Sequence, residues 1–318
     1  MGKVTEIPWC DSTLNLVMGC SAGCELSNGI CFAERWCRRL AGRPGYPKDF
    51  RKPELFPHRL AELRRWPNLT GTKRPDKPWL DGMPRVVFLN DLGETFDPAL
   101  PAEWLVEPRA WLHRPAIGRQ RRAHREQTSV YTVLSDSPHT FIILTKQPRR
   151  MHDFFATYPC PPNVWPGVSV TTQATADERV PWLQGIDAKV RVISHEPALG
   201  PVNWSEWTMK GRHGDWPPSF DWLISGGESG PGARLCDLAW LRFDRNQRGG
   251  LAWFLKAVGA RPCEAGGYRG VSPEIDGRPM TTLKLKHPAG ADESEWPADL
   301  QGCRQVPRLT AAAGKERT

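Results

Sequence analysis

The chain has 318 residues, of which 39% are hydrophobic and 25% charged, and its formal net charge is +8. This length can bury a substantial core, and the composition is ordinary for a globular protein in water. No apolar run approaches the roughly 18 residues of a membrane-spanning helix, and the first residues lack the apolar region of a secretory signal. We therefore expect a cytoplasmic protein without a membrane partner.

Seven short apolar runs follow one another along the chain, and each ends on polar or glycine-rich residues. Most are separated by enough chain for a helix and its loops. Continuous apolar strands of this length fit a parallel sheet that is buried on both faces, and strand–helix alternation favours right-handed βα units. The runs span residues 12–20, 85–91, 140–146, 163–172, 189–197, 220–230 and 250–256.

These runs predict an α/β fold. We expect a partial (β/α) TIM-like barrel with about six or seven parallel strands, because the runs are one short of a closed eight-stranded barrel. The barrel is assigned to residues 1–262. Residues 263–318 have glycine and proline spaced as in turns, which predicts a small C-terminal extension that ends in a disordered tail.

Four of the nine cysteines lie in the first part of the chain, in the stretch GCSAGCELSNGICFAERWC. The odd cysteine count and the expected cytoplasmic location disfavour disulfide bonds and favour metal binding. The spacing C-x3-C-x6-C-x5-C lacks the paired C-x2-C of common zinc modules, although four thiolates can hold a structural zinc ion. Three ligands, Cys20, Cys24 and Cys31, suit an iron–sulfur cluster with one iron left open. In that case Cys37 lies on the following helix.

Polar or glycine residues stand at the end of each predicted strand. In a parallel βα barrel the carboxyl ends of the strands meet at one mouth, and active sites form there. A cysteine cluster at such a mouth favours an iron–sulfur cluster over structural zinc. The residues at the strand ends are Cys20, Asn90, Asp91, Thr145, Lys146, Thr171, Thr172, His195, Glu196, Gly226, Gly227, Glu228 and Lys256.

Two of these ends allow a finer prediction. His195 and Glu196 are adjacent on an extended strand, so their side chains face opposite ways and only one of them enters the barrel. A buried histidine at a strand end is more often a structural residue, so we expect a structural role for His195. Lys256 is costly to bury without a partner, so we expect it beside an acid such as Glu228 or Glu196.

The positive charge is concentrated in two stretches. Residues 35–65 contain ten Lys or Arg against three Asp or Glu, and residues 109–125 contain six arginines and no acid. Localised positive charge is typical of proteins that bind DNA or RNA, because neutralised phosphates release counterions. A solvated basic face is the alternative.

Several short motifs, taken in order, resemble the radical SAM superfamily, and more closely the radical-SAM-like phage proteins of unknown function. The resemblance runs from about Ile7 to Gly259. One departure is the separation of Cys24 and Cys31 by six residues, where the family brings its last two cysteines close together. This leaves Cys37 as an alternative third ligand. The motifs are IPWCDSTLNLVMGC, CFAER, LTKQPRRM, PGVSVTTQ, HEPALGPVNW, ISGGESGPGAR and AWFLKAVG.

The resemblance implies a [4Fe-4S] cluster held by Cys20, Cys24 and Cys31, which thereby become the catalytic residues. Its open iron binds S-adenosylmethionine. An electron from an external donor then yields a 5′-deoxyadenosyl radical that abstracts hydrogen from the substrate. A bacterial or phage-infected cell is the implied setting.

The resemblance also implies roles for the other strand ends. The segment with Asn90, Asp91, Gly93 and Glu94 would receive the methionine amino group. Lys146 would pair with the methionine carboxylate, and Ser169 and Thr171 would contact the ribose. The remaining candidates for contact with adenine or substrate are Glu196, Gly226, Gly227 and Glu228.

Three functions stay open at this point. The first is a radical SAM enzyme that modifies a nucleotide or a nucleic acid, and the basic stretches favour it. The second is a radical SAM enzyme for a peptide or a small molecule. The third is a zinc-stabilised nucleic-acid-binding protein without catalytic activity.

Overall fold

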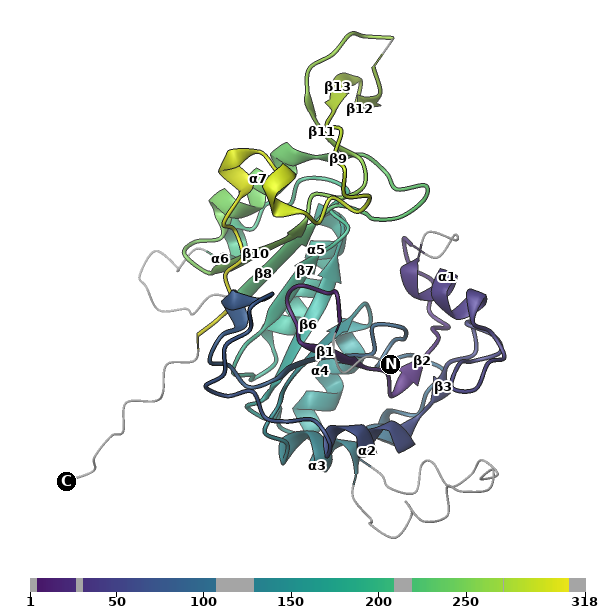
Figure 1. Ribbon diagram of the computed structural model, residues 1–318. Helices are drawn as coiled ribbons and strands as arrows, with labels where there is room; N and C mark the ends of the chain where they lie inside the picture. Colours follow the sequence, from purple (N-terminus) through teal and green to yellow (C-terminus); the bar gives the residue numbers. More distant parts are fainter. Residues whose placement is uncertain (1–4, 27–30, 107–128, 209–218, 271, 309–318) are drawn as a thin grey trace, which may run out of the picture.

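A computed structural model describes the chain except for residues 1–4, 27–30, 107–128, 209–218, 271 and 309–318 (Figure 1). Its centre is a seven-stranded parallel sheet in the order β1-β4-β5-β6-β7-β8-β10, curled into a half-barrel and flanked by helices. The strands are β1 (Ser12–Leu14), β4 (Val86–Leu89), β5 (Thr140–Thr145), β6 (Val164–Val170), β7 (Val192–His195), β8 (Trp222–Gly226) and β10 (Ala252–Ala257). The predicted partial barrel is confirmed.

Helices follow the central strands and cover the outside of the sheet. The helix α4 connects β5 to β6 and packs against α5, which connects β6 to β7. The first two helices lie in the long segment between β2 and β4 (Figure 1). The helices are α1 (Phe32–Arg39), α2 (Leu60–Leu63), α3 (Val130–Ser135), α4 (Pro148–Thr157), α5 (Gln173–Gln184), α6 (Ser205–Thr208) and α7 (Leu238–Gln247). No helix in the described residues is long and apolar enough to cross a membrane.

Polar residues at the strand ends start some of these helices. Thr172 is the N-cap of α5, and it shares a capping box with Thr175. Asp237 caps α7 by accepting a hydrogen bond from the amide of Ala239 at 2.9 Å. Such caps satisfy amides that have no partner inside the helix. The polar strand ends therefore position helices as well as the mouth.

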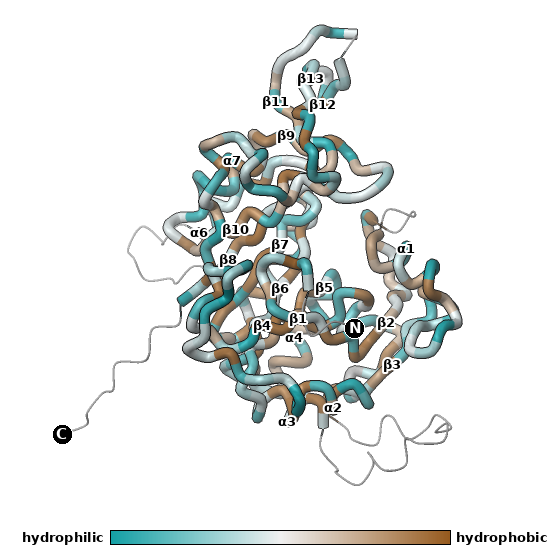
Figure 2. The backbone as a smooth tube through the Cα atoms, viewed as in Figure 1, coloured by the Kyte–Doolittle hydropathy of each residue, from teal (hydrophilic) through white to brown (hydrophobic). Residues whose placement is uncertain are grey.

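Side chains that alternate along the strands pack into two apolar layers, one against the helices and one inside the barrel. In β5, Phe141 and Ile143 face the helices, whereas Ile142 faces the barrel interior. The apolar colour in Figure 2 follows the central strands, as expected when both faces are buried. The two-sided burial explains why these strands are visible in the sequence as continuous apolar runs.

A layer of aromatic rings fills the amino end of the barrel. Trp9 lies ahead of β1, and its ring centroid is 6.4 Å from that of Trp222. The ring of Trp222 also contacts those of Trp165 and Phe254, each at 6.1 Å between centroids. All four side chains are at most 2% exposed. The amino end is therefore closed, and the polar residues are left at the carboxyl end.

Short strands form two further sheets. The strands β2 (Val17–Met18) and β3 (Glu54–Leu55) pair beside the first helix. A four-stranded sheet has the order β12-β13-β11-β9. Its strands are β9 (Cys236–Asp237), β11 (Pro262–Ala265), β12 (Glu274–Ile275) and β13 (Arg278–Thr282).

The C-terminal extension is joined to the barrel by backbone pairing. The assigned boundary at residue 262 falls at the start of β11, which pairs with β9 from the preceding part of the chain. Further on, the amide of Leu255 in β10 donates to the carbonyl of Cys303, and the amide of Gln305 donates to the carbonyl of Trp253. The extension thus adds to the edge of the central sheet. The expected tail after residue 308 lies outside the described residues.

Candidate functional site

The cysteine segment leaves the barrel at the carboxyl end of the sheet, where two glycines bring it against the loop after β4. Gly19 and Gly93 form an isolated parallel bridge. The amide of Gly19 donates to Leu92 at 2.9 Å, and the amide of Glu94 donates to Gly19 at 3.2 Å. Gly19 has φ +95°, and a Cβ atom on Gly93 would lie 2.6 Å from the backbone of β2. Larger residues do not fit this crossing.

A second contact fixes the residue after the first cysteine. Asp97 is fully buried and accepts hydrogen bonds from both the amide and the hydroxyl of Ser21, the amide at 2.7 Å. The amide of Ala99 also donates to Asp97, at 2.9 Å. Asp97 was not among the predicted site residues, although it lies only three residues after Glu94 in the same loop.

A third contact fixes the residue after the second cysteine. Glu25 receives two hydrogen bonds from Arg179 of α5, both at 3.1 Å, and one from the hydroxyl of Thr171 at 3.2 Å. Arg179 also donates to the carbonyl of Ser169 at 2.7 Å. Burial raises the pKa of Glu25, but the bonds from Arg179 outweigh it and lower the pKa overall. Of the two residues predicted to contact a ribose, Thr171 therefore bonds to the cysteine segment through its hydroxyl, and Ser169 orients Arg179 through its backbone carbonyl.

The predicted cysteine ligands line this anchored segment. The side chains of Cys20, Cys24 and Cys31 are partly exposed, whereas that of Cys37 is buried. Cys20 and Cys31 both pack against one apolar cluster, which consists of Met18, Cys37, Phe50, Phe56 and Leu92. Burial, followed by the charges of Glu94 and Asp97, raises the pKa of Cys20 to about 12.

The thiols supply the soft donors that iron–sulfur clusters and zinc require. Within the described ranges, no group of three or more His, Cys, Asp or Glu side chains is positioned to hold a metal ion. Cys37 is 1% exposed inside the apolar cluster, and its Sγ points to the carbonyl of Leu92 at 3.9 Å. This environment suits packing, and the choice between Cys24 and Cys37 as a third ligand stays a prediction.

Asn90 holds the turn between β1 and β2. Its Oδ1 accepts the amides of Leu16 at 2.7 Å and Val17 at 2.9 Å, and its Nδ2 donates to Thr95 at 2.8 Å. Its φ of 66° is left-handed, a conformation that Asn tolerates better than most residues. The side chain is thus engaged within the protein itself.

Asp91 and Glu94 lie in the same loop and are both carboxylates in low-dielectric surroundings. Asp91 accepts from the side chain of Asn15. Glu94 accepts from the hydroxyl of Thr145 at 2.6 Å and from the backbone amide of Lys146 at 3.0 Å. Burial raises the pKa of both carboxyls. For Glu94 the hydrogen bond from Thr145, then those from the amides of Lys146 and Phe96, and last the charge of Lys146 partly offset this effect.

On the opposite wall of the mouth, Lys256 and Glu196 form an ion pair. Both side chains keep access to solvent, at 26% and 19% exposure. This confirms the expectation that Lys256 lies beside an acid. Gly226 borders the pair, because a Cβ atom on it would lie 3.6 Å from Glu196. These are charged groups at the carboxyl end of the barrel that a ligand can approach.

His195 faces away from this pair, as predicted. It is fully buried, and its Nδ1 lies 2.7 Å from Asp244 of α7. Asp244 also accepts hydrogen bonds from Ser225 and Trp204, both at 2.7 Å. This network joins the outer face of the sheet to α7. His195 is therefore a structural residue.

The glycine-rich loop after β8 folds against its own neighbours. A Cβ atom on Gly227 would collide with the backbone of Val258, so this glycine permits close packing of β8 and β10. Glu228 accepts three hydrogen bonds from the amide and guanidinium of Arg234, between 2.9 and 3.1 Å. Burial raises the pKa of Glu228, but Arg234 outweighs it, and the pKa is lower than usual.

One arginine joins the first helix to this loop. Arg35 of α1 donates to the carbonyl of Pro231 at 3.0 Å. A Cβ atom on Gly230 would lie 2.7 Å from the Arg35 guanidinium. The start of α1 and the loop after β8, which are 196 residues apart at this contact, therefore meet beside the mouth.

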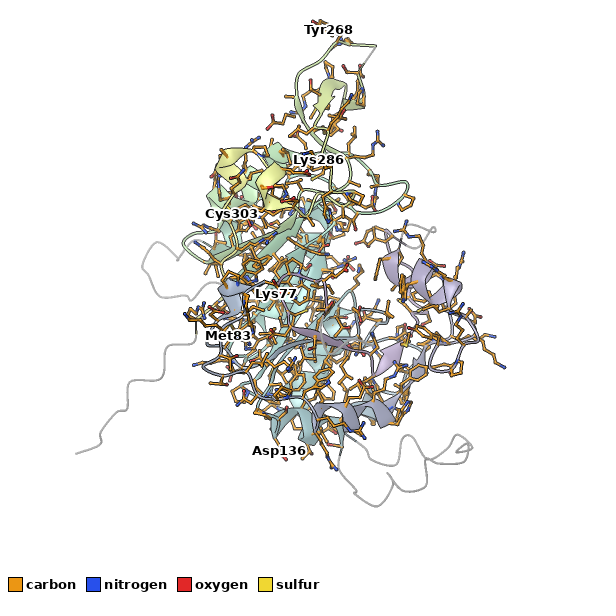
Figure 3. All side chains as sticks on the ribbon, in the orientation of Figure 1. Lys77, Met83, Asp136, Tyr268, Lys286 and Cys303 are labelled. Carbon is orange, nitrogen blue, oxygen red and sulfur yellow. The ribbon has the colours of Figure 1, made fainter. Side chains whose placement is uncertain are left out.

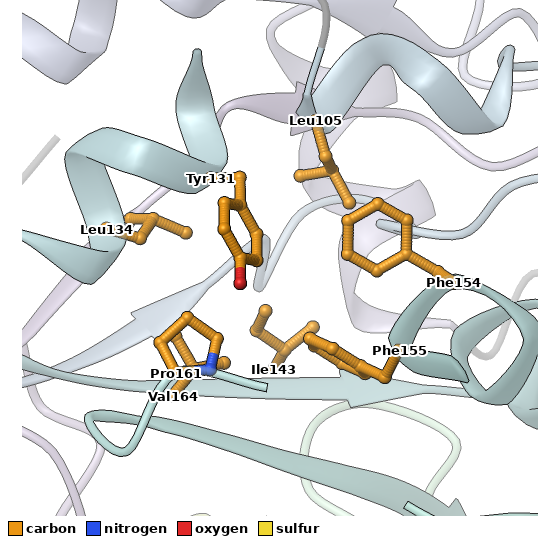
Figure 4. Close-up of a pocket in the computed structure, with 8 residues that line it drawn as sticks. All are labelled: Leu105, Tyr131, Leu134, Ile143, Phe154, Phe155, Pro161 and Val164. Carbon is orange, nitrogen blue, oxygen red and sulfur yellow. The ribbon is translucent and has the colours of Figure 1, made fainter. Parts of the chain in front are cut away.

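Two cavities among the described residues lie away from the charged groups of the mouth. A cavity of about 20 Å³ between α3, α4 and β5 is lined only by Leu105, Tyr131, Leu134, Ile143, Phe154, Phe155, Pro161 and Val164 (Figure 4). Its size suits one water molecule, but its lining is apolar, so it is a packing defect. A recess of about 240 Å³ beside α1 is lined by Glu34, Cys37, Arg38, Ala41, Lys48, Asp49, Phe50 and Arg51.

Of the two basic stretches, residues 35–65 are described, whereas all of 109–125 lies outside the described residues. A family-wide sequence model with the description "Protein of unknown function (DUF5131)" matches residues 4–114 and 122–293. The gap in this match falls within the arginine-rich stretch. No curated protein and no solved structure matches the chain.

Proposed function

We propose that the chain is a radical S-adenosylmethionine enzyme. It belongs to the DUF5131 family of proteins of unknown function. Its substrate would be a nucleotide or a nucleic acid. The observation that carries the proposal is the triple anchoring of the cysteine segment at the barrel mouth. Gly19 pairs with Gly93 through the backbone, Ser21 donates a hydrogen bond to Asp97, and Glu25 forms an ion pair with Arg179.

Such anchoring matters because thiols that hold a reactive cluster need a fixed position relative to the substrate. Cys20, Cys24 and Cys31 would hold a [4Fe-4S] cluster, and their thiol chemistry fits it. When bound, the cluster and S-adenosylmethionine supply a carbon radical that removes a hydrogen atom, given an electron from an external donor. The protein itself would orient the cofactor and the substrate and exclude competing reactions.

The charges at the mouth suit the two ends of an amino acid. The carboxylates of Asp91 and Glu94 lie in the loop beside Cys20 and would attract an ammonium group. Glu94 already accepts two hydrogen bonds from the end of β5, so its orientation is fixed before any ligand arrives. The amine of Lys146, which acts electrostatically on Glu94, would attract a carboxylate.

The opposite wall would hold the rest of the cofactor or the substrate. The Lys256–Glu196 ion pair offers both a donor and an acceptor at the edge of the barrel. The aromatic layer with Trp9 and Trp222 lies below and keeps bulk water from entering through the amino end. A dry, one-sided site of this kind would protect a reactive radical.

A nucleic-acid substrate is favoured by the charge of residues 35–65, which contain ten basic and three acidic residues. Part of this stretch is α1, which contacts the loop after β8 through Arg35. The basic surface would therefore approach the mouth directly, and phosphates are the natural counterparts of clustered arginines.

The test is anaerobic reconstitution of the full chain with iron and sulfide. We expect about four iron and four sulfide per chain. On reduction with dithionite the protein should form 5′-deoxyadenosine. Cys20→Ala and Cys31→Ala should abolish both the brown colour and the cleavage. Cys303→Ser, a partly exposed cysteine in the extension, serves as the control and should retain both.

Two outcomes would contradict the proposal. Stoichiometric zinc without labile sulfide after anaerobic preparation would indicate a structural metal site. A full cluster that never cleaves S-adenosylmethionine would exclude the radical chemistry. Cleavage that no nucleic acid or nucleotide stimulates would instead favour a peptide or a small molecule as substrate.

A further inference from the structure

The first helix exposes two aromatic rings and buries a carboxylate. Phe32 is 58% exposed and Trp36 is 40% exposed, whereas Glu34 and Cys37 on the other face are 1% exposed. Surface helices normally place their apolar residues toward the core and their charges toward water. The exposed pair therefore needs an explanation other than packing.

The two rings are arranged as one surface. Phe32 and Trp36 are one helical turn apart, with 6.1 Å between ring centroids and 16° between ring planes. This is a stacked pair within the usual range for aromatic contacts. The guanidinium of Arg39 lies over the Trp36 ring, 5.6 Å from its centroid. Phe32, Trp36 and Arg39 thus present flat, polarisable groups on one face of the helix.

Positive charge surrounds this surface. Arg38, Arg39 and Arg43 are exposed. Arg38 pairs with the buried Glu34 at 2.7 Å but keeps 69% of its side chain in contact with solvent. An exposed apolar surface inside a basic region is a poor site for a neutral protein partner. It suits a ligand with flat rings and negative charges.

The position of the surface connects it with the barrel mouth. Phe32 directly follows Cys31, which packs with Cys20 against the same apolar cluster. On the next turn, Arg35 is hydrogen-bonded to Pro231 in the loop after β8. A ligand lying along Phe32 and Trp36 would therefore lie beside Cys31 and beside the helix that contacts the loop after β8.

We propose that Phe32, Trp36 and Arg39 form a stacking platform for the unpaired bases of a nucleic-acid strand. Exposed arginines of α1 would hold the phosphates, and the adjoining base would be delivered to the mouth. As a substrate assignment this rests on the proposed function. As a binding surface it is measurable without the cluster or the cofactor.

The central experiment measures binding of a fluorescein-labelled 15-nucleotide single strand to the full chain by anisotropy. Trp36→Ala should weaken binding about tenfold, within the roughly 5- to 150-fold that one lost base stack costs. Trp36→Tyr, which keeps an aromatic face, should restore most of it. Circular dichroism melts of each variant establish that it is folded.

Matched controls come from aromatic residues elsewhere. Phe243 on α7 is also 40% exposed, and Tyr268 is 79% exposed at the far tip of the extension (Figure 3). Phe243→Ala and Tyr268→Ala should each change the affinity less than twofold. An equal loss in these variants and in Trp36→Ala would overturn the proposal.

Two further strands separate base stacking from charge. On an abasic strand of the same length, Trp36→Ala should cost nothing, because there is no base to stack. A duplex of the same sequence should be equally insensitive to this substitution. A loss of similar size on either probe would contradict the platform.

Salt dependence tests the arginines independently. Arg39→Gln should lower the slope of log affinity against log salt by about 0.7, the value for one phosphate contact on a single strand. Trp36→Ala should leave the slope unchanged. Polyglutamate is the competing probe: binding to it with the same dependence on Trp36 would identify an acidic polypeptide as the partner and overturn the proposal.

The outcomes for the platform and for the enzyme are distinguishable. Stacking-dependent binding by a chain that assembles no cluster supports the platform and removes the radical chemistry. A chain that cleaves S-adenosylmethionine but binds single strands independently of Trp36 overturns the platform alone. Parallel assays with DNA and RNA strands identify the sugar that the surface accepts.

Discussion

Glu25 and Arg179 form a two-point ion pair across 154 residues of sequence. Arg179 is 6% exposed and Glu25 is 23% exposed, so the pair is only partly screened by water. The contact ties the segment between Cys20 and Cys31 to α5. The pair is thus one of the three contacts that fix the cysteine segment relative to the barrel.

Removing this pair should loosen the cysteine segment. Arg179→Gln should lower the free energy of unfolding by about 2 kcal/mol, because bonds between a guanidinium and a carboxylate are lost in a buried place. Limited proteolysis should also cleave residues 20–31 faster than in the wild type. Arg149→Gln is the control, since Arg149 is 76% exposed and pairs loosely with Asp153. Unchanged proteolysis in Arg179→Gln would show that the ion pair does not hold the segment.

The crossing at Gly93 should tolerate no side chain. In Gly93→Ala the new Cβ atom would lie 2.6 Å from the carbonyl oxygen of Val17, and backbone moves less readily than side chains. We expect a loss of about 1–3 kcal/mol in urea denaturation. Gly200→Ala, with no atom within 4 Å of its new Cβ, should be neutral or stabilising by about 0.4–1 kcal/mol. Equal effects of the two substitutions would disprove the steric argument.

The network around His195 should be costly to interrupt. Asp244 is fully buried and receives hydrogen bonds from His195, Ser225 and Trp204. Asp244→Ala leaves these donors without their acceptor, so stability should fall by at least about 3 kcal/mol. Asp177→Ala, on the exposed face of α5, should change stability by less than about 0.5 kcal/mol. Thermal melts of both variants check the difference.

The pair of Glu228 and Arg234 should make stability depend on pH. The pKa of Glu228 is lower in the folded chain than in the unfolded chain, so between the two values the unfolded chain binds more protons. Its contribution is present above about pH 4.5 and is lost as the pH falls through the folded pKa.

Comparison of the wild type with Glu228→Gln measures this contribution. The wild type should be more stable by about 1 kcal/mol at pH 6, a modest value because Arg234 is 37% exposed. The difference should shrink as the pH is lowered from 6 toward 3, because the Glu228 carboxylate becomes protonated as the pH falls through its folded pKa. A difference that stays constant between these pH values would place the effect in packing rather than in charge.

The sequence predicted the barrel because its strands are buried on both faces and therefore read as continuous apolar runs. The prediction that Lys256 pairs with an acid succeeded for a related reason, since a partly buried ammonium group requires a nearby charge. Both predictions depend on the immediate surroundings of a residue: burial for the strands and a nearby opposite charge for Lys256. The parallel order of the strands then brings their polar ends together.

The anchors of the cysteine segment were not predicted. Ser21 and Asp97 are 76 residues apart, and Glu25 and Arg179 are 154 apart, so their pairing depends on the order of strands in the sheet. The short strands β2, β9 and β12 have two residues each and carry no periodicity to detect. A known strand order would have made Arg179 a candidate partner for the cysteine segment, because it lies on α5, the helix that follows β6.

The aromatic layer of Trp9, Trp165, Trp222 and Phe254 has a consequence for kinetics. Since it blocks the amino end of the barrel, the reactants of the proposed enzyme would all have to arrive and depart at the carboxyl end. Two ligands that share such a passage bind in sequence, and the one that goes deeper must enter first and leave last. Steady-state measurements should then show ordered kinetics, with the later ligand trapping the earlier one.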